Sequence, residues 1–117
     1  MTVKVMIKRH IKEGKAKEVF ALLNKHRFNA MTQKGYITGE TLMSYQNPHH
    51  LLVISTWQSI ENWLAWKANK ERRANEAKLE QFLESPTEYD EYIFGTYPLK
   101  NKRKTQDISY EVWPFQL

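Results

Sequence analysis

Short segments of strand and helix periodicity follow one another along this chain in an order that leaves few folds open. Alternation of apolar and polar residues is typical of a strand, whereas apolar residues three and four apart are typical of a helix. The patterns predict strand, helix, strand, strand, helix and strand over residues 2–10, 15–33, 36–46, 50–57, 59–83 and 89–97. This order predicts an α+β fold, a ferredoxin-like βαββαβ sandwich with an antiparallel sheet.

The first and third strands are expected at the centre of the sheet. Val3, Val5 and Ile7 alternate with other residues, which predicts one well-buried face. Residues 51–54 form an unbroken apolar run, as in a strand that is covered on both faces. Right-handed crossovers then place both helices on one face of the sheet.

The opposite face of the predicted sheet has no cover within the chain. Met6, Thr41, Met43, Tyr45 and Tyr92 are candidates to lie on one face or the other. A second sheet would supply the cover, so we expect a homodimer packed sheet to sheet. The alternative is a monomer whose C-terminal tail folds back over its own sheet.

The chain length predicts a single domain, residues 1–98, followed by a C-terminal extension, residues 99–117. Residues 100–106 are polar and resemble a linker, and Ile108, Tyr110 and Val112 then alternate as in an appended strand. Because a tail rich in aromatic residues is rarely left in solvent, we expect this strand to pack, and it could be exchanged with the partner subunit.

Composition narrows the function classes. The 117 residues carry 18 Lys and Arg against 13 Asp and Glu, a net charge of +5, and +2 of it lies in residues 100–117. This modest, tail-weighted excess argues against a nucleic-acid partner. No apolar run approaches the roughly 20 residues that cross a bilayer, so no membrane partner is expected. The absence of cysteine excludes thiol chemistry and is compatible with the cytoplasm, the location we expect.

Trp66 is the most informative single residue. On a continuous helix over residues 59–83, one stripe of apolar residues faces the core, with Trp63 at its edge: Ile60, Leu64, Ala68, Ala74 and Phe82. Trp66 points nearly opposite, and an indole in that position needs a cleft or another subunit. Asn62 and Arg73 project in roughly the same direction. The spacing predicts a pocket with an aromatic wall, an amide and a cation; the alternative is that Trp66 packs under the tail or at a subunit interface.

Several short segments carry a family resemblance: Val53-Ile54-Ser55-Thr56-Trp57 followed by Ser59, Trp63-Leu64 and Trp66; the turn Glu13-Gly14-Lys15; and Gln33-Lys34-Gly35-Tyr36 before the second strand. Together with the opening strand, they resemble the antibiotic biosynthesis monooxygenase domain family over residues 2–96. The resemblance implies a dimeric α+β barrel. Members of that family include cofactor-independent monooxygenases that oxidise phenolic polycyclic intermediates, quinol monooxygenases and haem-degrading enzymes.

The haem-degrading branch is similar in having a tryptophan at the position of Trp66, together with an asparagine on strand one and a histidine further along helix two. Here the strand-one position is Met6, and Asn75 and Glu76 stand near the place of that histidine. The histidines of this chain lie outside helix two: His10, His26, His49 and His50. The resemblance therefore favours the branch without haem, and we expect no cofactor.

In the cofactor-independent branch, a tryptophan and polar partners bind the substrate and assist its deprotonation, which implies such roles here for Trp66 and its neighbour Asn62. An enzyme of this kind needs an apolar cavity and a group that stabilises an anion. Arg73 or His10 could stabilise a phenolate or the developing superoxide, although His10 also fits a solvated strand end. His49 and the histidine beside it stand in a predicted turn without visible partners, so no metal site is expected. The cavity is expected from Met6, Phe20, Met43, Tyr45, Trp66 and Tyr92.

We therefore predict a small cofactor-independent monooxygenase that acts on an aromatic phenol or quinol. The predicted catalytic residues are Trp66, Asn62 and Arg73, and the predicted substrate-binding residues are Met6, Phe20, Met43, Tyr45, Tyr92 and His10. The alternative is a non-catalytic ligand-binding or interaction module of the same dimeric fold, in which side chains fill the pocket.

Overall fold

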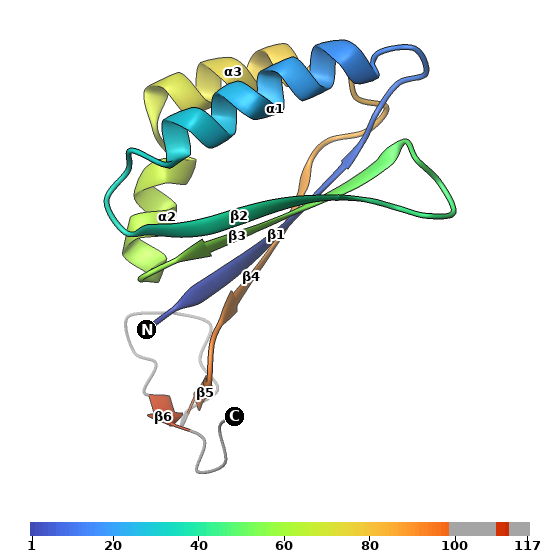
Figure 1. Ribbon diagram of the computed structural model, residues 1–117. Coiled ribbons are helices and arrows are strands. Elements are labelled where there is room, and N and C mark those ends of the chain that lie inside the picture. The colour runs from blue at the N-terminus through green and yellow to red at the C-terminus, as the bar shows by residue number, and fades with distance from the viewer. Residues whose placement is uncertain (99–109, 113–117) are drawn as a thin grey trace.

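The computed structural model describes residues 1–98 and 110–112 of the chain. Its helices lie as a layer over a twisted sheet (Figure 1). The elements in chain order are β1 (Val3–His10), α1 (Ala16–Ala30), β2 (Tyr36–Met43), β3 (His50–Trp57), α2 (Ile60–Lys67), α3 (Lys70–Glu80), β4 (Glu88–Ile93), β5 (Thr96–Pro98) and β6 (Tyr110–Val112).

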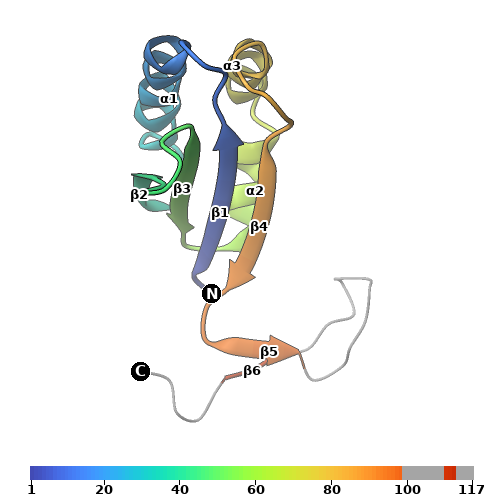
Figure 2. The same ribbon diagram turned by 90° about the vertical axis from the view of Figure 1, so that its right-hand side faces the viewer.

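The first four strands form one antiparallel sheet in the order β2-β3-β1-β4. β1 and β3 are its central strands, and Val5 of β1 lies opposite Ser55 of β3 and Glu91 of β4. All the helices of the described chain lie on one face of this sheet (Figure 1, Figure 2). The ferredoxin-like α+β fold expected from the periodicity is confirmed.

Alternation along β1 divides its side chains between the two faces of the sheet. Val3, Val5 and Ile7 are buried under the helices, and Arg9 continues this inner row with only 2% of its surface exposed. The face that no helix covers, hereafter the open face, receives the other residues of the strand. These are Lys4, Met6, Lys8 and His10.

A glycine closes the turn between α1 and β2, as expected. Gly35 has φ +85°, a backbone conformation that disfavours other residues. A Cβ atom at Gly35 would also lie 2.2 Å from Oδ1 of Asn62, so the start of α2 packs directly on this turn. α1 itself ends at Ala30, three residues earlier than the expected boundary at residue 33.

The predicted second helix is two helices, separated at Ala68 and Asn69. Ser59 caps α2 by accepting a hydrogen bond from the backbone N–H of Asn62, and Asn69 caps α3 in the same way through Arg72 N–H. Because a new cap stands inside the predicted helix, the side chains of α3 do not continue the directions of those of α2. The interruption had been expected slightly later, between residues 70 and 73.

The inward face of α2 differs from the expected one. Trp63 and Trp66 are buried at 0% and 5% exposure, whereas Leu64 is 47% exposed. The predicted stripe was therefore wrong for Leu64, whereas Ile60 packs against the buried tryptophans as expected. Two large indoles bury more apolar surface than one leucine, so they determine the orientation of this short helix.

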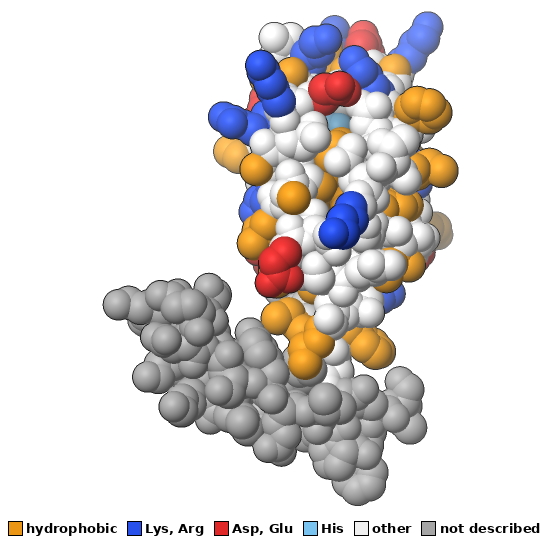
Figure 3. Space-filling model, turned by 90° about the vertical axis from the view of Figure 1, so that its left-hand side faces the viewer, with side chains coloured by type: hydrophobic (Ala, Val, Ile, Leu, Met, Phe, Trp, Pro, Cys, Tyr) orange, Lys and Arg blue, Asp and Glu red, His pale blue; other side chains and the backbone are white. Residues whose placement is uncertain are grey.

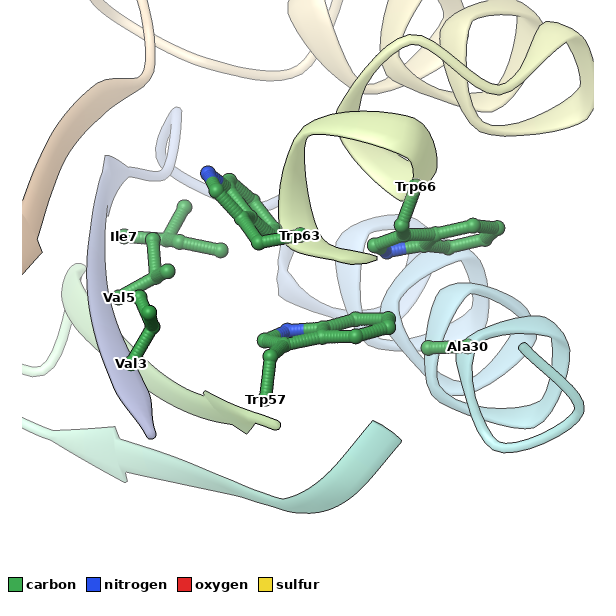
Figure 4. Close-up of a cluster of buried hydrophobic side chains, with 7 residues drawn as sticks. All are labelled: Val3, Val5, Ile7, Ala30, Trp57, Trp63 and Trp66. Atoms are coloured by element: carbon green, nitrogen blue, oxygen red, sulfur yellow. The ribbon is translucent and has the colours of Figure 1, made fainter. Parts of the chain in front are cut away.

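Two hydrophobic clusters fill the space between helices and sheet. The first, the tryptophan cluster, comprises Val3, Val5, Ile7, Ala30, Trp57, Trp63 and Trp66. In Figure 4 the indoles of Trp57 and Trp66 lie one above the other, while Trp63 faces the β1 side chains. The second cluster comprises Ile11, Val19, Leu23, Leu51, Leu79 and Leu83.

The C-terminal extension contributes only a short described strand. β6 pairs with β5 of the same chain in a separate two-stranded sheet, beyond the end of β4 (Figure 2). The predicted linker and the Trp113-Pro114-Phe115 segment lie outside the described residues. Within the described residues, no helix is long and apolar enough to cross a membrane.

Candidate functional site

Charged and polar side chains are buried between the two hydrophobic clusters. They come from β1, α1 and α3, and they lie on the inner face of each element: Arg9, His26, Arg72, Asn75 and Glu76. Ionised groups leave water only at a large cost in desolvation unless partners compensate them. This group, hereafter the charged cluster, is therefore the first place to look for function.

Glu76 is the centre of the charged cluster. Its Oε1 accepts a hydrogen bond from Arg9 Nη1 at 2.6 Å, and its Oε2 accepts one from His26 Nε2 at 3.1 Å. Arg72 Nη2 approaches the same Oε2 at 3.5 Å. Arg9 also donates to the Thr87 hydroxyl at 3.1 Å. One carboxylate thus joins the strand and both helices that cover it.

His26 is held as one neutral tautomer by its two neighbours. Because the Glu76 carboxylate only accepts hydrogen bonds, the His26 ring must carry its proton on Nε2. Nδ1 then accepts from the Asn75 side-chain amide at 3.0 Å, and the same amide donates to the Leu22 carbonyl at 2.9 Å. Protein groups therefore occupy both ring nitrogens of His26.

The titration of both groups follows from this arrangement. Burial lowers the pKa of His26 below its ordinary 6.5, and the positive charges of Arg9 and Arg72 lower it further, against the opposing effect of Glu76. Burial alone would raise the pKa of Glu76, but hydrogen bonds from His26 and Arg9 and the two guanidinium charges lower it to about 2. At neutral pH the cluster holds two positive charges and one negative charge.

Arg72 connects the charged cluster with aromatic side chains. Its Nη2 donates to the Tyr89 hydroxyl at 2.9 Å, and its guanidinium carbon lies 5.4 Å from the ring centres of both Trp63 and Tyr89. Aromatic faces attract cations, which partly replaces the lost hydration of the guanidinium. Arg72 is 4% exposed.

A small cavity of about 40 Å³ lies where the charged cluster meets the tryptophan cluster. Its lining combines apolar and basic side chains, and it comprises Ile7, Arg9, Leu23, His26, Arg27, Ala30, Thr41, Val53, Trp66 and Arg72. A water molecule needs roughly 10–15 Å³ of such space, so the cavity has room for a few water-sized groups. Among the described residues, no carboxylate lines it.

The outer edge of the cavity lies between α1 and β2. Arg27 of α1 donates a hydrogen bond to the Thr41 hydroxyl of β2 at 2.7 Å, and both side chains line the cavity. This bond is exposed to solvent. A larger ligand that enters between α1 and β2 would have to break this hydrogen bond.

Trp66 forms the aromatic wall of the cavity. Its ring lies 6.5 Å from that of Trp57 at an interplanar angle of 26°, and it meets His26 edge to face at 6.3 Å. Trp66 therefore offers a flat aromatic face to the cavity.

The other predicted catalytic residues do not reach this cavity. The Asn62 amide oxygen accepts from the Ser59 hydroxyl at 2.8 Å, so this side chain is engaged at the start of α2. Arg73 is exposed and lines an open groove outside α3, where the buried Arg72 also contributes. On a continuous helix, Arg73 would point in the same direction as Trp66. Because the helix is interrupted at Asn69, Arg72 points toward the core instead.

The predicted substrate-binding residues lie apart from Trp66. Met6, His10 and Tyr92 belong to the open face, and Phe20 packs against the second hydrophobic cluster. Met43 is 53% exposed and Tyr45 is 99% exposed. His10 and Met43 line one open groove away from Trp66, the structure of one chain does not bring the whole set into one pocket, and a role for these residues in binding stays a prediction.

Sequence signals for the missed residues exist in hindsight. Arg9 extends the inner row of Val3, Val5 and Ile7 by two residues, and His26 stands three residues after Leu23 on the buried stripe of α1. A polar residue on an otherwise apolar face is the informative observation. Arg72 had no such signal, because its direction depends on where α3 begins.

Metal ligands do not gather in the described part of the chain. No group of three or more His, Asp or Glu side chains is placed to hold an ion there. His10 and His50 stack at 3.9 Å between ring centres on the open face.

Comparisons with known proteins agree with the fold. Residues 2–78 match the family of antibiotic biosynthesis monooxygenases. Protein SchA of Streptomyces halstedii is 26% identical over 98 residues, which are 84% of this chain but only 23% of SchA. A conserved protein from Methanosarcina mazei Go1 superimposes with a TM-score of 0.75 at 18% identity, over 79% of this chain and 91% of that one. SnoaB of Streptomyces nogalater, a cofactor-independent oxygenase, gives 0.71 at 12% identity, over 79% and 91%.

Proposed function

Because the chain belongs to the antibiotic biosynthesis monooxygenase family, we propose that it is a cofactor-independent monooxygenase acting on an aromatic phenol or quinol held against Trp66. The observation that carries this proposal is the two-sided cavity. Trp66, Ile7 and Val53 offer apolar surface to a ring, and Arg9 and Arg72 offer positive charge to an ionised oxygen. A phenol bound in this way is favoured as its phenolate.

The chemistry needs no electron donor besides the substrate. Loss of the phenolic proton makes the ring electron-rich, and one electron passes to dioxygen to give a substrate radical and superoxide. These combine through a new carbon–oxygen bond into a hydroperoxide, which loses water to leave a ring carbonyl. One oxygen atom enters the product, the other leaves as water, and the substrate supplies all the electrons.

The protein contributes positioning and electrostatics to this sequence. Both nitrogens of His26 are hydrogen-bonded within the protein, and Glu76 with its pKa of about 2 is a weak base. The proton therefore leaves the phenol because the guanidinium groups stabilise its anion, rather than because a strong base removes it. We expect the catalysed rate to rise with pH as more of the substrate ionises.

The substrate ring requires more room than this cavity offers. At about 40 Å³ the cavity accepts a few atoms, so we propose that the ring enters where Arg27 and Thr41 meet. β2 is an edge strand, and most of its side chains are exposed, so its contacts with α1 are few. Thr41→Val removes the exposed hydrogen bond without changing the side-chain size, and it should lower KM.

We also propose that the chain works as a homodimer through the open face. Tyr92 is 56% exposed and Leu42 is 44% exposed, and both face away from the helices beside Met6, Leu52 and Ile54. An exposed apolar surface of this kind is typical of an interface. Exchange of the C-terminal extension between subunits would add to it. Size-exclusion chromatography with light scattering should give twice the chain mass of 14.0 kDa, and Leu52→Lys should give monomers.

A non-catalytic binding module of the same fold is the second candidate, and one observation favours it. Trp66 is 5% exposed and the cavity beside it is small, as expected of a pocket that side chains have filled. Such a module would bind a small molecule without consuming oxygen.

Oxygen uptake by the purified, metal-free protein distinguishes the two candidates. A panel of quinols and anthrone-like phenols should be oxidised faster than the spontaneous rate, and Trp66→Ala should abolish the difference. Trp66→Phe keeps an aromatic face but loses the N–H, so it should retain part of the activity. Absence of any enhancement from folded, dimeric protein would instead support the binding module.

A further inference from the structure

The cavity beside Trp66 carries an uncompensated positive charge. Arg9, Arg27 and Arg72 line it together with the neutral His26, and no described carboxylate does. Glu76 neutralises one guanidinium of the buried pair, and Glu91 of β4 pairs instead with Lys67 at 3.1 Å. Two buried guanidinium groups against one carboxylate leave a net charge of +1.

A buried donor in this group also lacks a partner. Arg9 is 2% exposed, and its Nε has no hydrogen-bond acceptor within the protein. Buried polar groups are nearly always satisfied by protein, water or a ligand. An unpaired guanidinium N–H at a positively charged cavity calls for an acceptor, and an anion is the acceptor that also balances the charge.

The size of the cavity restricts the ligand. About 40 Å³ admits a halide or an anion of a few atoms and excludes a larger one such as gluconate. Access is favourable for an anion, because Lys and Arg side chains are more plentiful than Asp and Glu over the helical side of the molecule (Figure 3).

We propose that this cavity is a binding site for a small monovalent anion, such as chloride or nitrate, held by Arg9 and Arg72. The site has a second role, which rests on the proposed function. During oxidation, the ionised oxygen of the phenol would occupy the place of the inorganic anion. Binding of the inorganic anion requires no catalytic activity.

Thermal unfolding of the full chain tests the site directly. Chloride should raise the unfolding midpoint when it replaces gluconate at constant ionic strength, because a ligand of the folded state alone stabilises it. Arg72→Met should weaken chloride binding and so raise the dissociation constant about tenfold, because the anion loses a charged partner. Arg73→Met is the matched control, since it removes the same charge from an exposed neighbouring position and should bind chloride normally.

Two further variants keep the test independent of how well Arg72→Met folds. Glu76→Gln raises the charge of the cluster to +2, so it should bind chloride more tightly than the unmodified chain. Ala30→Leu fills the cavity and changes no charge, so it should abolish the chloride effect. Equal stabilisation by chloride and gluconate, equal effects of the two arginine variants, or weaker binding by Glu76→Gln would overturn the proposal.

Oxygen uptake then distinguishes the two sources of the anion. If the phenolate oxygen shares the site, chloride should raise KM for the phenol and leave kcat unchanged. Chloride binding without competition would support the site and assign it to inorganic anions alone. The unfolding measurement does not depend on oxygenase activity, so a result against the oxygenase would not contradict the anion site.

Discussion

The two ends of the layer between helices and sheet are built from opposite chemistry. The tryptophan cluster encloses Trp57 and Trp63 at 0% exposure, whereas the charged cluster a few residues further along β1 encloses Arg9 at 2%. Burial of indoles stabilises a fold with little demand on geometry. Burial of ions costs desolvation that apolar residues of similar volume would avoid, so stability does not explain the charged end.

The two ends meet at Trp66. Its ring lies against Trp57 on one side and meets the edge of His26 on the other, with the cavity beside it. This boundary gives a ligand an apolar wall and a charged wall at once, and neither end supplies both alone. We therefore propose that the tryptophan end supplies stability and that the charged end supplies ligand chemistry.

The largest effect is expected from the tryptophan end. Trp57→Ala should lower the free energy of unfolding by about 4 kcal/mol, because it removes a fully buried indole and leaves a cavity. Urea denaturation followed by circular dichroism measures it. Trp57→Phe should cost clearly less, and a loss below about 1 kcal/mol for the alanine variant would contradict the role given to this cluster.

A slightly smaller loss of stability is expected at Glu76, and it distinguishes the charged end from the tryptophan end. Glu76→Leu should cost about 3.5 kcal/mol, because it leaves two guanidinium groups buried without their carboxylate. Addition of Arg9→Met and Arg72→Met should recover most of that loss, since an apolar replacement of a whole buried ion network is close to neutral. If the triple variant stays as unstable as the single one, the charged end is itself structural.

Acid should weaken the charged end most, and the pKa of Glu91, which hydrogen bonds from Trp63 and Lys67 also lower, adds a smaller loss at the tryptophan end. The folded chain keeps Glu76 ionised and His26 neutral to lower pH than the unfolded chain does, so the unfolded state binds more protons and stability falls on acidification. The His26 contribution is complete above pH 6.5 and declines below it. The Glu76 contribution, roughly 3 kcal/mol, is complete above pH 4.5 and is lost towards pH 2.

Denaturation across this pH range checks the assignment of the slope. His26→Gln has no titrating ring, so its stability should be flatter between pH 7 and 5 than that of the unmodified chain. An unchanged slope in His26→Gln would place the titrating group elsewhere.

The smallest effect is expected at the surface near both ends. Lys67 pairs with Glu91 at 3.1 Å and lies 4.6 Å from the Tyr89 ring centre. Because Lys67 is partly exposed, Lys67→Met should cost only about 0.5 kcal/mol, and added salt should reduce the difference. A loss comparable with that of Trp57→Ala would remove the contrast between surface and buried charges.

The periodicity of the sequence was sufficient for the fold and insufficient for the site. Residues such as Val3, Val5 and Ile7 repeat a local pattern, and such patterns specify strands, helices and their order. The inward direction of Trp66 and Arg72 depends instead on the cap at Asn69, a single residue that restarts the helix. The rotation of the helix was predicted wrongly by one residue, so Arg73 was predicted to line the pocket in place of Arg72.

The charged cluster could not be assembled from sequence because its members are distant along the chain. Arg9 and Glu76 are 67 residues apart and His26 and Glu76 are 50 apart, so only the tertiary structure brings them together. Trp66 was identified as a candidate from its place on the helix, and it lines the cavity, while its role there stays a prediction. The reason first given, a direction away from the core, was wrong.

Oxygen uptake by the triple variant Arg9→Met, Arg72→Met, Glu76→Leu shows whether ligand chemistry resides in the charged cluster. This variant should be nearly as stable as the unmodified chain, and it should no longer accelerate oxidation of a phenol which the unmodified chain oxidises. Full acceleration by the stable triple variant would contradict the assignment of ligand chemistry to the charged end.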